Sequence, residues 1–250
     1  IERYFLPYFG ERTLEELTHS DIVQFEAWRN RQMMKTPRAS TLNNFSAAWS
    51  RLIQTGVNRG WISANAIIPR LNTRGEKSTP RPAFTAEEVD QLLIYMQDWI
   101  SRGRFSVEHE TRPLLRDYVE MLLLTGMRHG TEAMGLCWNH CEWYWHKEQR
   151  YLRLWVSGKT GPRWLIAKHE LVFVLHRLHS RQRDIVLKPF DSVLGKHKGW
   201  LFRTADGRRP YNFNGLFRRL LRHAELLTNG AGETRTLYSL RHTYATVELL

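Results

Sequence analysis

Over residues 1–70, apolar side chains recur at three- and four-residue intervals, which is the period of an amphipathic helix. Thr18 or Ser20 can cap a helix that carries Ile22, Phe25 and Trp28 on one stripe. A second helix, over about 38–59, has an apolar face made of Leu42, Phe45, Trp49, Leu52 and Ile53. The pattern therefore predicts that residues 1–70 are helical throughout.

The periodic pattern stops between residues 69 and 82, where the sequence reads PRLNTRGEKSTPRP. Pro, Gly, Lys and Arg dominate this stretch, which is typical of an exposed linker. The pattern resumes at Thr85, which forms a capping box with Glu88 at the start of the next helix. The buried stripe of that helix consists of Val89, Leu92, Leu93, Met96 and Ile100. We predict a domain at 1–70, a basic linker at 71–82 and a second domain at 83–250.

The second domain changes from helical to strand-like sequence and back. A helix over about 112–124 is predicted to end at Gly126, a natural C-terminal cap. Alternating aromatic sequence follows from Trp143 to Ile166, and turns near 147–150 and 158–162 divide it into three short antiparallel strands. Helices resume at about 169–179, 211–227 and 237–250. The predicted fold class is mainly α with a small antiparallel sheet (α+β).

Composition adds a class of partner to this picture. Lys and Arg number 37 against 25 Asp and Glu, so the formal net charge is +12 and the pI is near 10.0. A field of this sign attracts polyanions and favours nucleic acid as the partner. No apolar run approaches the roughly 20 residues that span a bilayer, and no secretory apolar region is present. We therefore expect a cytoplasmic protein that makes no contact with a membrane.

Two cysteines, Cys137 and Cys141, lie in the segment CWNHCEWYWH. With His140 and His146 they could suggest zinc, but the spacing matches no familiar zinc pattern. Neighbouring side chains of an extended segment also point to opposite faces. We predict two reduced structural thiols and no metal site. The lack of a disulfide framework also favours the cytoplasm.

Three basic residues stand in distinctive frames of the second domain. Arg128 lies in LLLTGMRHGTEAMGLCW, Lys159 in the strand-like LRLWVSGKTGPRWLI, and Arg241 in TLYSLRHTYAT. Two guanidinium groups can hold the non-bridging oxygens of one phosphodiester, and a lysine can protonate the departing oxygen. The frame of Arg241 contains no carboxylate, so a bound phosphate would be a natural partner. Taken alone, Arg128 could equally be a surface cap or a salt-bridge partner of Glu132.

This ordered Arg–Lys–Arg arrangement resembles the tyrosine recombinases, the phage-integrase family. Residues 7–19 and 37–62 resemble the family's helical core-binding domain, which clamps DNA, and residues 83–250 resemble its catalytic domain. The resemblance implies a site-specific recombinase or integrase of a mobile element, in which a tyrosine attacks a DNA phosphate. The reaction gives a 3′-phosphotyrosine and a free 5′-hydroxyl, without a metal or nucleotide cofactor, and strand exchange then rejoins the DNA.

The implied catalytic set is Arg128, Lys159, Tyr238 and Arg241, and it departs from the family pattern at one of these positions. The family usually has histidine where this chain has Tyr238, whose phenol is a poor general base at neutral pH. Its expected role is therefore a hydrogen bond to the phosphate. The family's acidic residue commonly lies three positions after the first arginine, whereas here Glu132 lies four positions after it.

The family's nucleophilic tyrosine lies a few tens of residues beyond the second arginine. The resemblance therefore places this residue beyond position 250, so the catalytic domain is expected to be C-terminally truncated. We expect residues 1–250 alone to be inactive in cleavage. Tyr244 is expected to be a core residue and His242 to have a structural role.

Candidate DNA contacts come from the second helix and from the linker. They are polar or basic side chains that suit phosphate oxygens, although a solvated helix face would look the same. The set is Arg38, Ser40, Thr41, Asn43, Asn44, Arg51, Arg74, Lys77 and Arg81.

The expected partner is duplex DNA at attachment sites. The resemblance implies a homotetramer on DNA, a monomer or weak oligomer when free, accessory DNA-bending proteins, and a bacterial or phage-encoded protein associated with the nucleoid. Two alternatives remain open: a non-cleaving sequence-specific or architectural DNA-binding protein with the same fold, and a type IB topoisomerase. The helical first domain favours the integrase.

Overall fold

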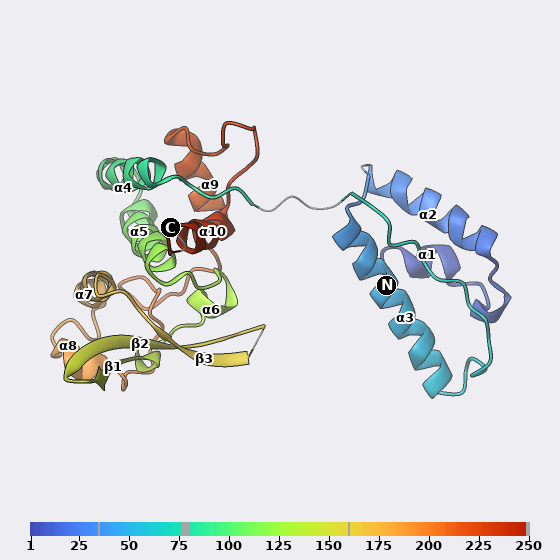
Figure 1. The fold of residues 1–250 in the computed structure, drawn as a ribbon, viewed down its shortest axis with the longest axis horizontal. Helices are drawn as coiled ribbons and strands as arrows, with labels where there is room; N and C mark the ends of the chain where they lie inside the picture. Colours follow the sequence, from blue (N-terminus) through green and yellow to red (C-terminus); the bar gives the residue numbers. More distant parts are fainter. Residues whose placement is uncertain (35, 77–80, 160, 249–250) are drawn as a thin grey trace. The chain divides into compact units, whose positions relative to one another are not determined.

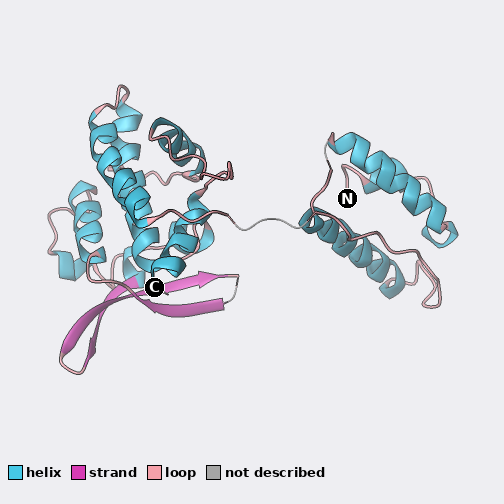
Figure 2. Cartoon of the chain, turned by 45° about the horizontal axis from the view of Figure 1, so that its top comes forward, coloured by secondary structure: helices cyan, strands magenta, loops and turns pink. Residues whose placement is uncertain are grey.

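The computed structural model describes residues 1–34, 36–76, 81–159 and 161–248 and divides the chain into two compact units (Figure 1). The N-terminal unit covers Ile1–Pro80 and the C-terminal unit covers Arg81–Leu250. Each unit is described by itself below. The predicted class of mainly helical structure with a small antiparallel sheet is confirmed (Figure 2).

The N-terminal unit is a helical domain around an aromatic core. Its elements are α1 (Phe5–Phe9), a 3₁₀ turn (Leu14–Glu16), α2 (His19–Met33) and α3 (Ala39–Asn58). The predicted cap at Thr18 is confirmed, because its hydroxyl accepts from the Asp21 amide while the Asp21 carboxylate accepts from the Thr18 amide. Phe5, Phe25 and Trp49 pack together at ring-centroid distances of 5.3 and 5.5 Å from Phe5. Such burial of large rings supplies most of the stability of a small domain.

The prediction that residues 1–70 are helical throughout is wrong for the segment that follows α3. Gly60, at a φ of 70°, ends the helix, and the described residues from there to 76 form turns and extended chain. Acidic side chains of the preceding elements hold this segment: Glu15 accepts from the Ser63 amide at 2.5 Å, and Glu26 accepts from the Asn72 amide at 2.6 Å. Tertiary hydrogen bonds replace a continued helix here, and sequence periodicity does not report them.

The C-terminal unit is built around α5 (Ser106–Thr125), a largely buried helix. Helices α4 (Ala86–Ser101), α7 (Leu171–Arg181), α9 (Asn214–His223) and α10 (Leu237–Glu248) pack against it. The short elements are α6 (Thr131–Met134), a 3₁₀ turn (Trp138–His140) and α8 (Phe190–Val193).

Two helix boundaries of this unit test the sequence predictions. The capping box of Thr85 and Glu88 is confirmed. The helix predicted over 211–227 is shorter, because the Asn212 side chain accepts from the Asn214 amide before α9 begins, and Glu225 takes a positive φ of 58° after it ends.

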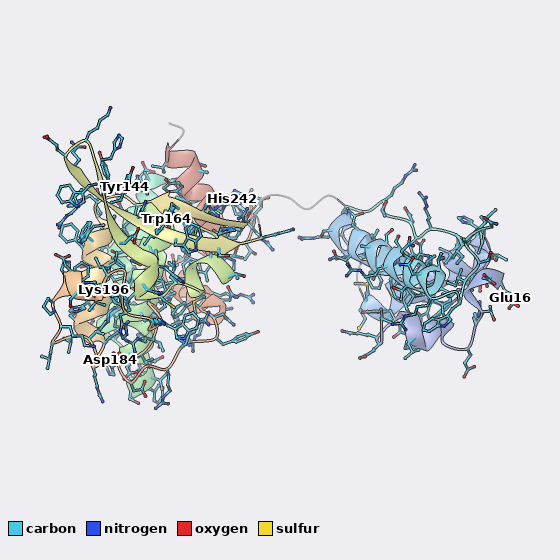
Figure 3. The ribbon with its side chains drawn as sticks, turned by 90° about the horizontal axis from the view of Figure 1, so that it is seen from below. Glu16, Tyr144, Trp164, Asp184, Lys196 and His242 are labelled. Atoms are coloured by element: carbon cyan, nitrogen blue, oxygen red, sulfur yellow. The ribbon has the colours of Figure 1, made fainter. Side chains whose placement is uncertain are left out.

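The predicted three-stranded antiparallel sheet is confirmed, in the order β1 (Cys141–His146), β2 (Gln149–Gly158) and β3 (Gly161–Ile166). Alternate residues of β2, such as Leu154 and Val156, are buried against the helices. The other face carries an arginine between aromatic rings. The Arg153 guanidinium lies 4.8 Å from the ring centroid of Tyr144 and 4.1 Å from that of Trp164, both labelled in Figure 3.

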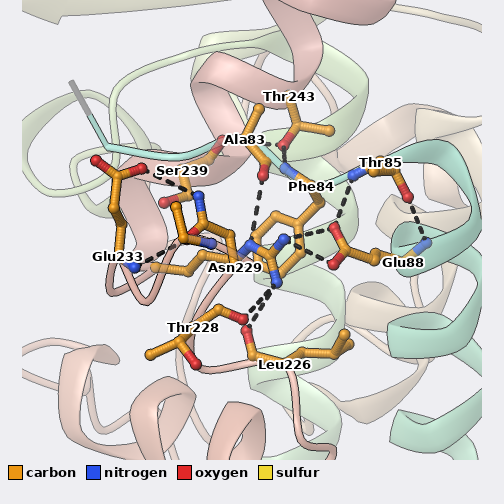
Figure 4. Close-up of polar contacts among 12 residues, drawn as sticks. Ala83, Phe84, Thr85, Glu88, Leu226, Thr228, Asn229, Glu233, Ser239 and Thr243 are labelled. Carbon is orange, nitrogen blue, oxygen red and sulfur yellow. Dashed lines mark hydrogen bonds and ion pairs between the residues drawn. The ribbon is translucent and has the colours of Figure 1, made fainter.

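A buried arginine, Arg235, ties the start of the C-terminal unit to the segment before α10, and its partners Glu88 and Ala83 are labelled in Figure 4. Arg235 is only 4% exposed, and its guanidinium donates to both carboxylate oxygens of Glu88 at 2.7 and 2.6 Å. It also donates to the main-chain carbonyls of Ala83, Leu226 and Thr228. The Thr243 hydroxyl of α10 accepts from the Phe84 amide at 2.9 Å. These contacts fix α10 relative to α4.

Candidate active site

Arg128 owes its position to the way α5 ends. The chain leaves the helix at Gly126, which has a φ of 60° and donates its amide to the Leu122 carbonyl at 3.0 Å. A side chain at Gly126 would collide with the ring of Tyr244 on α10. Glycine therefore allows both the reversal of the chain and the close approach of α10. The predicted cap is confirmed, and it places Arg128 in the loop between α5 and α6.

The second arginine is brought to the same place from far along the chain. Arg241, on α10, is half-buried and donates from Nη1 to the Gly126 carbonyl at 2.5 Å. This carbonyl lies only two residues before Arg128. The sequence does not reveal this main-chain partner of Arg241. The carbonyl accepts from Nη1, and the other guanidinium nitrogens can donate to a ligand.

The Arg128 side chain is paired with Glu132, as the salt-bridge alternative anticipated. Arg128 donates from Nη1 to Glu132 Oε1 at 2.7 Å and from its amide to Oε2 at 3.0 Å. Glu132 is only 2% exposed. Burial by itself raises the pKa of this carboxyl, but hydrogen bonds from Arg163 and Arg128 outweigh burial and lower the pKa to about 2. Glu132 is therefore ionised at neutral pH and orients the loop that carries Arg128.

Arg163, on β3, is a site residue that the sequence did not single out. It donates from Nη1 to Glu132 Oε1 at 3.2 Å and from Nη2 to Glu132 Oε2 at 3.1 Å. Its cross-strand partner on β2 is Val156, whose side chain is buried on the face that meets the helices. The alternation of buried and exposed residues along the strands was the sequence signal for Arg163. A basic residue opposite a buried position of the neighbouring strand requires an acidic partner.

Lys159 lies in the turn that follows β2, and its side chain is exposed. Gly158, the residue before Lys159, lies close to the carboxylate that pairs with Arg128. A Cβ at Gly158 would lie only 2.6 Å from Glu132 Oε1. Absence of a side chain at Gly158 therefore lets the end of the hairpin approach the buried carboxylate. The next residue, 160, lies outside the described residues.

Tyr238, on the first turn of α10, contacts two imidazole rings: that of His129 in the loop before α6 and that of His242 on α10. Its ring centroid is 6.2 Å from that of His129 and 5.0 Å from that of His242, both in edge-on arrangement. Tyr238 is 37% exposed, so its phenol is accessible to a ligand. Burial lowers the pKa of His129, which favours its neutral form at neutral pH. His129 was not predicted as a site residue, although its place directly after Arg128 was a signal.

Tyr244, also on α10, makes packing contacts with its neighbours. Its half-buried ring packs on Gly126, and the Lys168 ammonium lies 5.9 Å from the ring centroid. The expectation that Tyr244 is a core residue is met only in part, because its ring packs on Gly126 but is half-buried.

A cavity of about 360 Å³ adjoins the cluster and is also lined by residues that were not predicted. Arg209 and the 97% exposed Tyr211 come from the loop before α9, where basic and aromatic residues in a turn-rich segment were the signal. The lining also includes His129, Gly130, Thr131, Asn212, Asn214 and Leu237. Buried Tyr118, whose pKa burial raises to about 12, accepts from the Gly130 amide and fixes the floor of this cavity.

The predicted DNA contacts on α3 form an exposed polar surface of the N-terminal unit. Ser40, Asn43, Asn44 and Arg51 are exposed, and Thr41 is half-buried. The sequence of α3 contains no Asp or Glu, so nothing on this helix repels a phosphate. Arg38, Arg74 and Arg81 are also exposed, whereas Lys77 lies outside the described residues.

The described ranges offer neither a metal site nor a membrane-spanning helix. No group of three or more His, Cys, Asp or Glu residues there could hold a metal ion. Cys137 and Cys141 are both buried, and burial raises the pKa of each thiol. Within the same part of the chain, no helix is both long enough and apolar enough to cross a bilayer.

Solved structures place the chain in a known fold. It matches the XerH site-specific recombinase in a post-cleavage complex with a palindromic difH substrate (16% identity, TM-score 0.57), covering 97% of this chain and 63% of XerH. A Tn1549 transposon integrase in complex with circular intermediate DNA matches with 18% identity and a TM-score of 0.62, over 99% of this chain and 79% of the integrase. A lambda integrase tetramer bound to a Holliday junction matches with 18% identity, a TM-score of 0.53, and coverage of 93% and 60%.

These likenesses show that the chain has the fold of the tyrosine recombinases and integrases, as its motifs suggested. The chain spans less than two thirds of the XerH and lambda integrase chains that it matches. No model of a protein family matches the sequence, and no curated protein matches it.

Proposed function

From the recombinase fold, we propose that this protein is a site-specific DNA recombinase or integrase that cleaves and rejoins strands through a 3′-phosphotyrosyl intermediate. One observation carries the proposal. The Arg241 guanidinium is hydrogen-bonded to a carbonyl two residues from Arg128, so two arginines far apart in the sequence lie together at the end of α5. Two half-buried cations at one place, beside the buried carboxylate of Glu132 on α6, suit a phosphodiester.

In the proposed reaction, the protein supplies position and charge. Arg128 and Arg241 neutralise the non-bridging oxygens as negative charge develops in the transition state. Lys159, exposed at the hairpin turn, protonates the departing 5′-oxygen. Tyr238 donates its phenol hydroxyl to a phosphate oxygen, because its ring is accessible and a phenol is a hydrogen-bond donor.

The attacking tyrosine is proposed to be neither Tyr238 nor Tyr244. Tyr244 packs on Gly126, and Tyr238 shares an α10 face with Arg241, where it suits phosphate binding. A tyrosine from outside the described residues would then be the nucleophile.

Duplex DNA is the proposed substrate, held by both units. The +12 net charge, the carboxylate-free α3 and the exposed Arg51 all favour phosphate contacts from the N-terminal unit. We propose that four copies assemble on two DNA sites, by analogy with the lambda integrase tetramer. Affinity should then fall steeply with salt, with a log–log slope of roughly −0.9 for each neutralised phosphate.

The test uses the protein together with the segment that carries the proposed nucleophile, and a nicked suicide substrate that traps a covalent protein–DNA adduct. We expect a denaturant-resistant adduct with the wild type and with Tyr244→Phe. Arg128→Ala and Arg241→Ala should form adduct at least about 100-fold more slowly while keeping most DNA affinity, because each arginine is one phosphate contact among many. Arg102→Ala, at an exposed ion pair of α4, is the matched control.

Two results would contradict the proposal. Salt-sensitive DNA binding without any adduct would favour the non-cleaving DNA-binding protein. An adduct that maps to Tyr238 or Tyr244 would overturn the assignment of those residues, because the phosphotyrosyl bond identifies the nucleophile directly.

A further inference from the structure

One carboxylate in the active site serves two arginines. Glu132 is only 2% exposed, and its oxygens accept from the Arg128 amide, from Arg128 Nη1 and from both terminal nitrogens of Arg163. A buried carboxylate requires a compensating cation, since an unpaired charge in the interior is strongly destabilising. Arg128 and Arg163 therefore share this task.

Their contacts with the carboxylate differ. Arg163 presents its guanidinium as a fork, with Nη1 on Oε1 at 3.2 Å and Nη2 on Oε2 at 3.1 Å. Arg128 uses one side-chain nitrogen, on Oε1 at 2.7 Å, and its second contact comes from the main chain. The fork of Arg163 is sufficient to compensate both oxygens, whichever ligand the Arg128 side chain binds.

We infer that Arg163 is a positioning residue for DNA cleavage: by neutralising Glu132, it leaves the charge of Arg128 to act on the scissile phosphate. The inference rests on the proposed function. With Arg163 present, Arg128, Glu132 and Arg163 carry one net positive charge. Without it, Arg128 and Glu132 form a neutral pair, and the phosphate must compete with a buried carboxylate for the Arg128 guanidinium.

The register of the hairpin and the glycine at its end place Arg163 beside Glu132. Antiparallel register pairs Arg163 with Val156 on the face of the sheet that packs against the helices. Gly158 leaves room for the Glu132 side chain, since a Cβ there would lie 2.6 Å from Oε1. The same sheet offers a matched control on its other face, where Arg153 pairs with Glu142 and lies 4.1 Å from the ring centroid of Trp164.

The experiment measures adduct formation on the suicide substrate by the protein that includes the proposed nucleophile, for Arg163→Met, Glu132→Gln, their double variant and Arg153→Met. We expect Arg163→Met to slow adduct formation by about 10- to 100-fold, as removal of a residue that supports a catalytic group commonly does. Its DNA affinity should stay near that of the wild type. The double variant should be faster than Arg163→Met, because it removes the uncompensated carboxylate with the arginine. Arg153→Met should react like the wild type.

A second substrate distinguishes an effect of Arg163 on Arg128 from an effect of Arg163 on the position of Lys159. When sulfur replaces the departing 5′-oxygen, the leaving group needs no proton, so a Lys159→Ala variant should be rescued. Arg163→Met should gain nothing from this substrate, because its defect lies at Arg128. Rescue of Arg163→Met to the same degree would overturn the inference.

Other outcomes also decide the question. A double variant no faster than Arg163→Met, or an Arg163→Met variant as fast as the wild type, would overturn the inference. If Arg163→Met does not fold, Arg163→Lys retains the charge and should react within about tenfold of the wild type, and a larger loss would contradict charge compensation. A wild type that binds DNA without forming an adduct would refute the proposed function instead.

Discussion

Replacement of Glu132 by glutamine should remove a defined part of the acid sensitivity of the fold. The pKa of this carboxyl falls from 4.5 to about 2 in the folded protein: burial raises it, and the hydrogen bonds from Arg163 and Arg128 more than reverse that effect. A folded pKa below the unfolded value stabilises the protein above the unfolded pKa, and the stabilisation is lost as the pH falls toward the folded pKa. The shift corresponds to about 3 kcal/mol at neutral pH.

The acid window follows from the same two pKa values. Between pH 7 and pH 3, about 2 kcal/mol of this stabilisation should be lost, because the unfolded carboxyl is then mostly protonated while the folded one is mostly ionised. Glu132 is almost fully buried, so screening by solvent reduces the effect little.

Urea denaturation of the wild type and of Glu132→Gln, followed by tryptophan fluorescence, measures this effect. The other carboxyl groups are common to both proteins and cancel in the difference. The stability gap between the two proteins should therefore narrow by about 2 kcal/mol from pH 7 to pH 3. A gap that stays constant over this range would refute the reasoning, because it would mean that Glu132 keeps an ordinary pKa in the folded state.

Two further substitutions test how the site is held. Gly126→Ala should destabilise the C-terminal unit by more than about 1 kcal/mol, because alanine is strained at a φ of 60° and would displace the Tyr244 ring. Gly215 on α9 is the control, because a Cβ there meets open space, so Gly215→Ala should leave the thermal midpoint unchanged or raise it. Equal thermal midpoints for the Gly126→Ala and Gly215→Ala variants would contradict the argument. Arg235→Met should cost about 3–5 kcal/mol in urea denaturation, since it leaves Glu88 and three carbonyls without their buried partner, and a loss below 1 kcal/mol would show that this cluster is dispensable.

The sequence by itself determined the elements whose signals are local. The capping box at Thr85 predicted the start of α4, and Gly126 predicted the end of α5. Such signals involve residues three or four apart, so the contacts that stabilise them are already present in the local sequence. Period-two alternation likewise predicted the three strands and the hairpin that carries Lys159. The frames of Arg128 and Arg241 indicated phosphate chemistry.

Only the tertiary structure decided which charged groups meet. Strand alternation could place Arg163 on the buried face of the sheet, but no local signal among the 37 Lys and Arg residues shows that Arg163 reaches Glu132 or that Arg235 reaches Glu88. The Gly126 carbonyl likewise becomes a partner of Arg241 only because α10 packs on α5. The segment after α3 leaves the helical pattern because distant acidic side chains bind its amides. Each of these contacts joins residues separated by long stretches of chain, so it depends on packing geometry that periodicity and spacing do not encode.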